Sequence, residues 1–260
     1  MENKHPYSIT FLGTGTSHGI PVIGCNCAVC TSTNIKDKRF RSSVLIESES
    51  TKVVVDTGPD FRQQMLRENI NWLDAILLTH EHRDHIAGID DIRVFNYRRK
   101  GALTFHCYPR VEKEIREAFA YIFANKKYPG IPEITFKNFE NDNFLVGDLP
   151  FKPLTVLHYK LPVAGFRVGN LAYITDVSAI PNSTLALLNN LDVLVLGCLR
   201  REPHIAHYHL EAALQIAQQI GAKQTYFIHM SHDMGLHNEV EAELPQNVHL
   251  SYDGLKLNFS

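Results

Sequence analysis

Four residues with metal-binding side chains lie close together in the segment Thr79–His85, which reads Thr-His-Glu-His-Arg-Asp-His. His80, His82, Asp84 and His85 offer imidazole nitrogens and a carboxylate, donors that suit Zn, Mn and Fe alike. His80 and His82 are two positions apart, so in an extended segment their side chains point the same way. Asp84 and His85 lie one step further, where the chain could turn into a helix. The segment therefore predicts ligands for two adjacent metal ions rather than a solvated polar loop.

A second group of metal-binding side chains lies near the start of the chain, where Cys25, Cys27 and Cys30 fall within six residues. The 5 cysteines are an odd number and too few for a disulfide scaffold in 260 residues, so the cluster indicates metal ligands before disulfides. Three thiolates need a fourth ligand to close a tetrahedral zinc site. A redox-active loop is the alternative. Cys107 and Cys198 have no partner motif and are expected to be buried as small apolar residues.

Composition and charge exclude several classes of protein. The 260 residues are 44% hydrophobic and 21% charged, which is typical of a globular protein, and a net charge of -2 gives no basic footprint for nucleic acid. No apolar run reaches the length of about 18 residues that a membrane-spanning helix needs. The first residues lack the apolar segment of a secretory signal. We therefore expect a cytoplasmic protein, without a membrane partner, whose residues 1–260 form a single domain.

The elements that must position these side chains alternate along the chain. Short apolar runs without polar alternation indicate strands buried on both faces. These runs are Ile9–Leu12, Val44–Ile46, Val53–Val55, Ala75–Leu78, Leu171–Ile174, Val193–Leu196 and Tyr226–Ile228. Amphipathic spacing predicts helices at Phe61–Leu66, after an Asp60 N-cap, at Val111–Phe123 and at Leu210–Ile220. Asn125–Asn141 is expected to be a surface loop. Strands interleaved with helices predict an α/β fold with two packed sheets and helices outside.

The pattern His80-x-His82-x-Asp84-His85 after a buried strand resembles the signature of the metallo-β-lactamase superfamily, in its binuclear hydrolase branch. The resemblance implies an αββα four-layer sandwich, in which two mixed sheets pack together with helices outside. It also implies three further ligands downstream: a His for the first metal, a strand-end Asp that bridges both metals, and a final His for the second metal. The residues that match in this order, each after a strand-like run, are His158, Asp176 and His229.

The cysteine loop carries a second resemblance. Cys25-x-Cys27-x-x-Cys30 closely resembles the loop of the PhnP-type cyclic phosphodiesterases, and PqqB-like proteins carry a similar one. In the PhnP type a His three residues after the last catalytic His is the fourth ligand, which implies His232 here. The implied structural zinc would tie this loop to the segment after His229.

Two further positions, Asp56 and His207, acquire roles from the resemblance. Asp56, which follows the run Val53–Val55, resembles the strand-end Asp that accepts a hydrogen bond from a metal-bound imidazole, with a simple turn residue as the alternative. His207 falls at the family's additional active-site His and is a general acid for the leaving group or a binder of the phosphate. His204 and His209 are neighbouring alternatives for that role.

The implied activity is that of a metal-dependent phosphodiesterase on a small or cyclic phosphodiester, such as a phosphoribosyl cyclic phosphate. A hydroxide activated by two divalent metals, Mn or Zn, would attack phosphorus, and His207 would assist departure of the leaving group. The implied ligands are His80, His82 and His158 for the first metal, Asp84, His85 and His229 for the second, and Asp176 as the bridge.

Two other functions stay open. A tRNase Z-like RNA-processing endonuclease has the same metal motif, and a local basic strip of Arg93, Arg98, Arg99 and Lys100 favours it. The net charge and the absence of a long insertion that could clamp RNA argue against it. The second alternative is a zinc-stabilised binding protein without catalytic activity, which an intact ligand set disfavours. The sequence leaves homodimer formation open.

Overall fold

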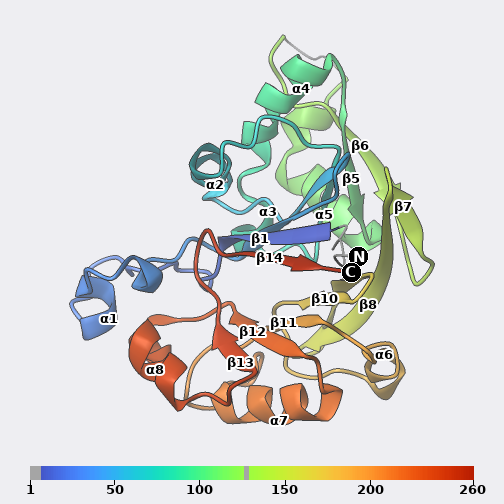
Figure 1. Cartoon of the computed structure of the whole chain (residues 1–260). Helices are drawn as coiled ribbons and strands as arrows, with labels where there is room; N and C mark the ends of the chain where they lie inside the picture. Colours follow the sequence, from blue (N-terminus) through green and yellow to red (C-terminus); the bar gives the residue numbers. More distant parts are fainter. Residues whose placement is uncertain (1–6, 126–128) are drawn as a thin grey trace.

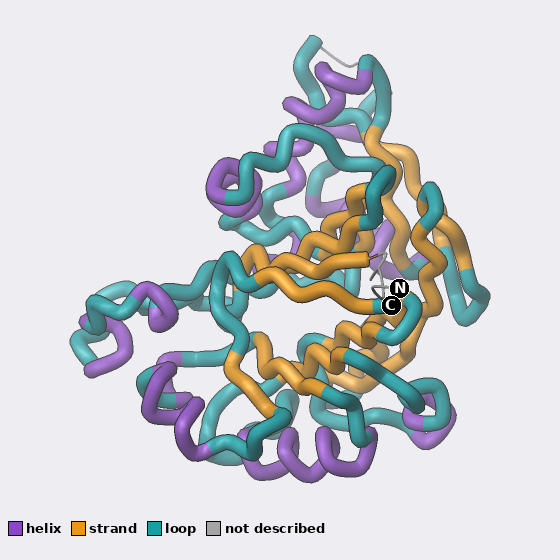
Figure 2. Tube along the Cα trace, in the orientation of Figure 1, coloured by secondary structure: helices purple, strands orange, loops and turns teal. Residues whose placement is uncertain are grey.

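The computed structural model describes residues 7–125 and 129–260. These residues form two mixed sheets of seven strands that lie face to face, with helices on their outer sides (Figures 1 and 2). The strand order is β14-β1-β2-β3-β4-β5-β6 in the first sheet and β13-β12-β11-β10-β9-β8-β7 in the second. This arrangement confirms the predicted αββα sandwich.

The strands of the first sheet are β1 (Tyr7–Gly13), β2 (Ser43–Glu47), β3 (Lys52–Val55), β4 (Ala75–Leu77), β5 (Leu103–Cys107), β6 (Ile134–Asn138) and β14 (Lys256–Phe259). Those of the second sheet are β7 (Phe144–Val146), β8 (Leu149–His158), β9 (Leu161–Val168), β10 (Leu171–Ile174), β11 (Val193–Gly197), β12 (Gln224–Ile228) and β13 (Val248–Leu250). The α-helices are α1 (Ala28–Thr31), α2 (Phe61–Arg67), α3 (Arg83–Ile86), α4 (Arg93–Arg99), α5 (Pro109–Ala118), α6 (Asn182–Leu185), α7 (Leu210–Ile220) and α8 (His237–Glu243). Short 3₁₀ helices are η1 (Ile35–Asp37), η2 (Ile89–Ile92), η3 (Ala120–Phe123) and η4 (His232–Met234).

Parallel pairing brings strand ends from different parts of the chain to one edge of each sheet. Strands β3, β4, β5 and β6 pair in parallel in the first sheet, and β10, β11, β12 and β13 do so in the second. Their carboxyl ends therefore lie side by side, which is where open α/β sheets place their ligand sites. The metal-binding residues predicted from the sequence follow β4, β10 and β12.

The core has three layers of apolar side chains. The central layer fills the space between the sheets and contains Phe11 and Val55 from the first sheet and Phe166 and Tyr173 from the second, all fully buried. One outer layer packs α2 and α5 on the first sheet, and another packs α7 and α8 on the second. Each large apolar side chain buried in this way contributes about 1.5–3 kcal/mol, so the sheets are held firmly enough to fix their polar edges.

The structure confirms the seven predicted strands and corrects three local expectations. Asp60 precedes α2 but does not cap it, because its carboxylate accepts hydrogen bonds from the backbone N–H and guanidinium of Arg41. The helix predicted at Val111–Phe123 ends at Ala118 and continues as the 3₁₀ helix η3.

The prediction that Asn125–Asn141 is a loop is wrong at Ile134–Asn138, which forms the edge strand β6. Its run Ile-Thr-Phe pairs in parallel with β5, and Phe136 packs edge-on against Phe105 at 6.1 Å between ring centroids. Lys, Asn and Pro around this run masked its strand character. Residues 126–128 of the same segment lie outside the described residues.

The buried imidazole of His106 predicts a pH-dependent term in stability. It stacks on Phe144 at 4.8 Å, and burial, reinforced by Lys137, lowers its pKa from 6.5 to about 4. The unfolded chain therefore binds a proton at His106 more tightly than the folded protein does. The stability that the neutral, buried ring contributes is complete above pH 6.5 and is lost as the pH falls toward 4. Between pH 7 and pH 4.5, we expect the free energy of unfolding to decrease less in His106→Phe than in the wild-type protein. Urea titration of both proteins at the two pH values measures this decrease. Equal losses for the two proteins would contradict this assignment.

Candidate metal centre

The segment from His80 to His85 leaves β4 and packs backbone to backbone against the turn after β3. The N–H of Thr57 donates to the carbonyl of His85, and the N–H of Gly88 donates to the carbonyl of Thr57, both at 2.8 Å. A Cβ at Gly58 would lie 2.1 Å from the carbonyl oxygen of Asp84, so only glycine allows this approach. The first-sheet ligands are therefore held by main-chain contacts and not by side chains alone.

The second sheet supplies the other predicted ligands from its strand ends. His158 is the last residue of β8, Asp176 follows β10 by two residues, and His229 directly follows β12. Asp176 and His229, together with Asp56 after β3, have positive φ angles of 46°, 65° and 66°. Non-glycine residues rarely adopt this conformation, and it persists only where the surroundings enforce it. The chain thus turns sharply after β3, β10 and β12, at the edge of the two sheets where the predicted ligands lie.

All seven predicted ligands of the binuclear site come together in two adjacent groups. Within each group, one donor atom per residue lies within 4.8 Å of the others. The first group is His80, His82 and His158, and the second is Asp84, His85, Asp176 and His229. Asp176 also lies within this distance of His158 and His207, so it connects the two groups.

A carboxylate beneath the centre orients the imidazoles. Asp56 is fully buried and accepts hydrogen bonds from Nδ1 of His85 at 2.7 Å and from the backbone N–H and hydroxyl of Thr79 at 2.8 Å. Since the Thr79 hydroxyl donates to Asp56, it accepts from Nδ1 of His80 at 2.9 Å. Nδ1 of His158 likewise donates to the carbonyl of Ala206 at 2.8 Å. These bonds fix the tautomer in which Nε2 of each ring is free to bind a metal.

Two of these Nε2 atoms are buried and have no hydrogen-bond partner among the described residues, namely those of His80 and His85. Nε2 of His85 faces Asp176 and Asp84, at 3.2 and 3.3 Å from a carboxylate oxygen of each, without hydrogen-bond geometry. A buried, unsatisfied polar atom costs about 1–3 kcal/mol. Because a divalent cation would satisfy both nitrogens and both carboxylates, the donor set fits a bound metal.

The centre is also electrostatically suited to cations. Burial raises the pKa of Asp176, but the neighbouring His229 and His85 outweigh it and hold that pKa well below the usual value. Burial lowers the pKa of His85, yet Asp84 and Asp176 outweigh it and raise the pKa well above its usual value. The carboxylates are thus anionic at neutral pH, and their ion-pair partners among the described residues are imidazoles, whose protons a metal would replace.

His207 lies closest to this centre among the three candidates for the additional active-site His. Its Nδ1 is 3.9 Å from Oδ1 of Asp176, and its ring lies 4.6 Å from that of His158. Burial, followed by repulsion from His229, lowers its pKa to about 3, so the ring is neutral at pH 7. His204 is exposed beside it, and His209 stands at the N-cap of α7.

The cysteine loop forms the second predicted site, on an extension that projects from the sheets and carries α1 (Figure 1). Nδ1 of His232 lies 3.3 Å from the sulfurs of Cys25 and Cys27 and 3.6 Å from that of Cys30. Tetrahedral zinc with ordinary bond lengths places sulfur and nitrogen ligands about 3.6 Å apart, so the four donors fit such an ion. A hydrogen bond from the Cys30 backbone, then one from His232, lowers the pKa of Cys27 to about 6, which favours the thiolate. Cys107 and Cys198 are buried, as predicted.

Four contacts of the centre were not identified from the sequence. The hydroxyls of Thr16 and Ser42 lie 3.2 and 3.1 Å from the two ring nitrogens of His229, Thr79 bridges Asp56 and His80, and the carbonyl of Ala206 accepts from His158. Thr79 precedes the His cluster and could have been found as a local donor. The other three come from distant segments and left no signal in the pattern.

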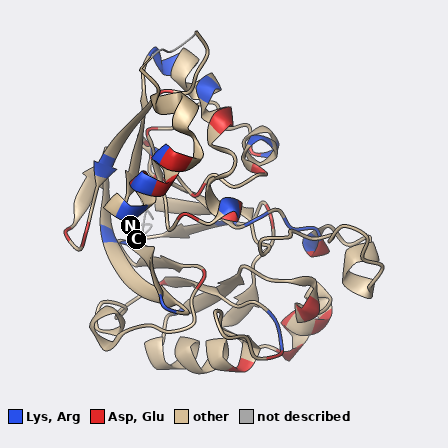
Figure 3. Ribbon diagram, turned by 180° about the vertical axis from the view of Figure 1, so that it is seen from behind, with Lys and Arg blue, Asp and Glu red and all other residues tan. Residues whose placement is uncertain are grey.

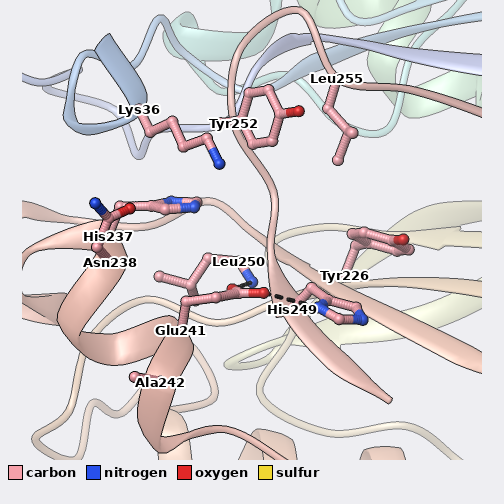
Figure 4. A pocket seen from close by; sticks show the side chains of 10 residues that line it. All are labelled: Lys36, Tyr226, His237, Asn238, Glu241, Ala242, His249, Leu250, Tyr252 and Leu255. Atoms are coloured by element: carbon pink, nitrogen blue, oxygen red, sulfur yellow. Dashed lines mark hydrogen bonds and ion pairs between the residues drawn. The ribbon is translucent and has the colours of Figure 1, made fainter. Parts of the chain in front are cut away.

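A separate cavity, of about 420 Å³, lies between α8, strands β12 and β13, and the loop before β14 (Figure 4). Tyr226, Tyr252 and Lys36 line it, and Glu241 holds His249 by a hydrogen bond of 2.7 Å. None of the predicted site residues lines it. Among the described residues, no helix is long and apolar enough to cross a membrane.

Comparison with known proteins agrees with this geometry. The family model "Beta-lactamase superfamily domain" matches residues 51–230. A crystal structure of a diphosphatase from the PhnP family superposes with a TM-score of 0.91 at 39% identity and covers 98% of both chains. Human tRNase Z, short form, has a TM-score of 0.67 at 17% identity over 97% of this chain and 99% of its own, which shows a shared fold alone. A protein of Porphyromonas gingivalis named octanoyltransferase is 40% identical over 248 residues, 94% of this chain. The chain spans about half the length of that relative, 50%.

The fold and these matches define a protein of the metallo-β-lactamase fold, and its donor set could hold metal ions. The chain belongs to the β-lactamase superfamily and, within it, to the PhnP-like branch, as its resemblance in sequence predicted.

If Asp56 orients His85 for metal binding, neutralising its carboxylate should weaken the binding of metal at the centre. Asp56→Asn keeps the size of the side chain but removes the charge that polarises His85, and loss of such a contact typically lowers metal affinity 10–100-fold, about the loss we expect here. Competitive titration against a fluorescent chelator measures this affinity, and Asp142→Asn, an exposed change outside the centre, is the control. Equal affinity in the two variants would refute the role.

If the cysteine site binds its own metal ion, removing one of its thiolates should cost the protein that ion alone. We expect Cys27→Ser to bind one metal fewer per chain, counted by mass spectrometry of the native protein, and to melt at a lower temperature because the loop is no longer tied to His232. The control is Cys107→Ser, which changes a buried cysteine that belongs to neither donor group and should leave the metal count unchanged. An unchanged metal count in Cys27→Ser would contradict the assignment.

Proposed function

We propose that this protein hydrolyses a small or cyclic phosphodiester with the help of two divalent metals, Mn or Zn, at the centre around Asp176. The observation that carries the proposal is the pair of adjacent donor groups, three imidazoles on one side and two carboxylates with two imidazoles on the other, joined at Asp176. Paired sites of this kind suit displacement at phosphorus, because both the entering and the leaving oxygen carry negative charge.

The residues that would hold the metals are those of the two groups. His80, His82 and His158 would bind the first ion, Asp84, His85 and His229 the second, and Asp176 both. When bound, the metals would supply an activated water and positive charge for the phosphoryl oxygens. A third ion, zinc, held by Cys25, Cys27, Cys30 and His232, would have a structural role.

The protein's own side chains would position these groups and the substrate. Asp56 and Thr79 keep His85 and His80 in the tautomer that presents Nε2 to the centre. Asp176 is held by the hydroxyl of Thr175 at 2.8 Å, so its carboxylate keeps one orientation. His207, neutral at pH 7, would donate a hydrogen bond through a ring N–H to the phosphate or to the leaving oxygen, rather than deliver a stored proton.

The similarity to a PhnP-family diphosphatase supports a substrate in which phosphorus is linked to a leaving group through oxygen. A diphosphate and a phosphodiester share this linkage, so both belong to the assay. The octanoyltransferase name describes a relative about twice as long, and we assign none of its activity to this chain.

RNA processing is the less supported alternative. Of the basic strip proposed for it, Arg98 and Arg99 donate to the carbonyls of Asn71 and Leu73, and Arg93 pairs with Asp90. Lys and Arg are interspersed with Asp and Glu in the view from behind (Figure 3). The carbonyl contacts hold Arg98 and Arg99 against the protein without neutralising their charge, but the interspersed acidic residues and a net charge of -2 disfavour a long phosphate backbone. The cytoplasmic location and a homodimer stay predictions.

Removing the shared ligand tests the proposal. We expect Asp176→Ala to lose both metals of the centre and at least 1,000-fold in turnover of bis-(p-nitrophenyl) phosphate, since the two sites depend on this carboxylate. Metal counts and initial rates measure the two effects, and Asp142→Ala serves as the matched control. Full activity in Asp176→Ala would contradict the proposal.

A further inference from the structure

The cavity of about 420 Å³ in Figure 4 lies where the edge strands β13 and β14 end the two sheets, and η1 and α8 close it on one side. Its volume is within the range of small-molecule sites, about 300–1,000 Å³. None of the residues grouped as metal ligands lines it, so the proposed function leaves this cavity without an occupant.

One hydrogen-bond donor of this cavity is a buried imidazole that lacks an acceptor. His237 is 2% exposed, and its Nδ1 lies 3.1 Å from a guanidinium nitrogen of Arg39. Because a guanidinium can only donate, Nδ1 accepts and the ring proton is on Nε2. Burial, followed by repulsion from Arg39, lowers the pKa of His237 to about 4, so the ring is neutral at pH 7. No described residue accepts from Nε2, which leaves this N–H available to a ligand in the cavity.

The second donor is an ammonium group without an acidic partner. Nζ of Lys36 lies 4.5 Å from the centroid of the Tyr252 ring, and no carboxylate of residues 7–125 and 129–260 lies within ion-pair distance of it. The ring of His237 packs edge-on against the same tyrosine, at 5.9 Å between centroids. Lys36 and His237 thus both extend toward Tyr252, as Figure 4 shows, so that one anionic group could contact both.

The acidic residue on the wall of the cavity, Glu241, is already engaged by the protein. Its Oε1 lies 2.7 Å from Nδ1 of His249, and its Oε2 accepts from the N–H of Leu250 at 2.7 Å. Glu241 therefore does not neutralise Lys36, but its charge would repel a doubly charged ligand. A singly charged anion suits the cavity better than a dianion such as a phosphate monoester.

The remaining wall is aromatic and apolar. Tyr226 from β12 and Tyr252 from the loop before β14 line it together with Leu250 and Leu255. The ring of Tyr226 lies 5.2 Å from that of His249. Since aromatic side chains pack well against another ring in offset or edge-on geometry, a flat apolar body fits this space.

We propose that this cavity binds a small aromatic carboxylate, whose carboxylate group contacts Lys36 and His237 and whose ring packs against Tyr226 and Tyr252. An ammonium and a ring N–H supply two donors for the two carboxylate oxygens, and the bond from the ammonium is charge-assisted. The inference goes beyond the proposed function and does not depend on it, because neither a metal ion nor phosphorus takes part in these contacts.

The protein itself holds the two donors in place. The N–H of His237 donates to Oδ1 of Asp37 at 2.8 Å, which ties α8 to η1, the 3₁₀ helix that carries Lys36. Arg39, which orients the His237 ring, is fixed in turn by its donation to the carbonyl of Ser251 at 2.6 Å. Binding would therefore cost little ordering of the donors.

The test uses phenylacetate as the probe and measures its binding to the metal-loaded protein by calorimetry. We expect saturable binding with a dissociation constant of about 1 mM or below. Phenylacetamide, which lacks the charge, and acetate, which lacks the ring, should each bind about tenfold or more weakly than phenylacetate. Lys36→Gln should weaken phenylacetate binding about tenfold or more, and Lys36→Arg should retain part of the affinity.

Two control variants locate the bound probe. Lys113→Gln removes an exposed lysine of α5 that lies 3.9 Å from the carboxylate of Glu117, and it should leave the affinity unchanged. Asp176→Ala should also bind phenylacetate as the wild-type protein does, because the metal centre is not the proposed site.

Three results would overturn the proposal: no saturable binding of phenylacetate up to about 10 mM, equal binding of phenylacetamide and phenylacetate by the wild-type protein, or equal affinity of Lys36→Gln and the wild-type protein. Loss of binding in Asp176→Ala with full binding in Lys36→Gln would place the carboxylate on the metals and would refute the cavity site. The proposed function is decided separately by turnover of bis-(p-nitrophenyl) phosphate, which Lys36→Gln should retain.

Discussion

The structure depends on one constraint at the candidate metal centre: the buried imidazole lone pairs and carboxylates there need a hydrogen-bond donor or a cation as partner. Nε2 of His80 and of His85 are buried without a hydrogen-bond partner, and Asp84 and Asp176 lie beside them as anions. With neutral imidazoles, Nε2 of His80, Nε2 of His85 and the two carboxylates are all acceptors, and none of them can satisfy another. A cation resolves the conflict, and its binding energy is available to stabilise the fold around it.

The rest of the fold holds the residues of this centre in position. Apolar layers on both sides of each sheet fix the strand ends, and the parallel strands deliver their carboxyl ends to one edge. Asp56, Asp176 and His229 then adopt positive φ angles, and at Asp56 the close approach of Gly58 to Asp84 and the hydrogen bond from His85 hold the turn in place. The three cysteines lie beside His232, so the loop after β1 meets the segment after β12.

The sequence predicted the parts of this arrangement that are local. The spacing of the His and Cys clusters brought their ligands together, and apolar runs located seven of the fourteen described strands, because both depend on neighbours in the chain. It missed the edge strand β6, where polar neighbours masked a short apolar run. The meeting of His158 with the carbonyl of Ala206, and of His229 with Ser42 and Thr16, arises from contacts between distant segments, which no local pattern contains.

The central claim is that two catalytic metals share Asp176 and a third ion has a separate structural place. Anomalous scattering from crystals grown with zinc or manganese tests it most directly. The account predicts two peaks about 3.5–4 Å apart on either side of the Asp176 carboxylate. It predicts a third peak enclosed by the three cysteines and His232. A single peak at the centre, or two peaks that Asp176 does not join, would contradict it.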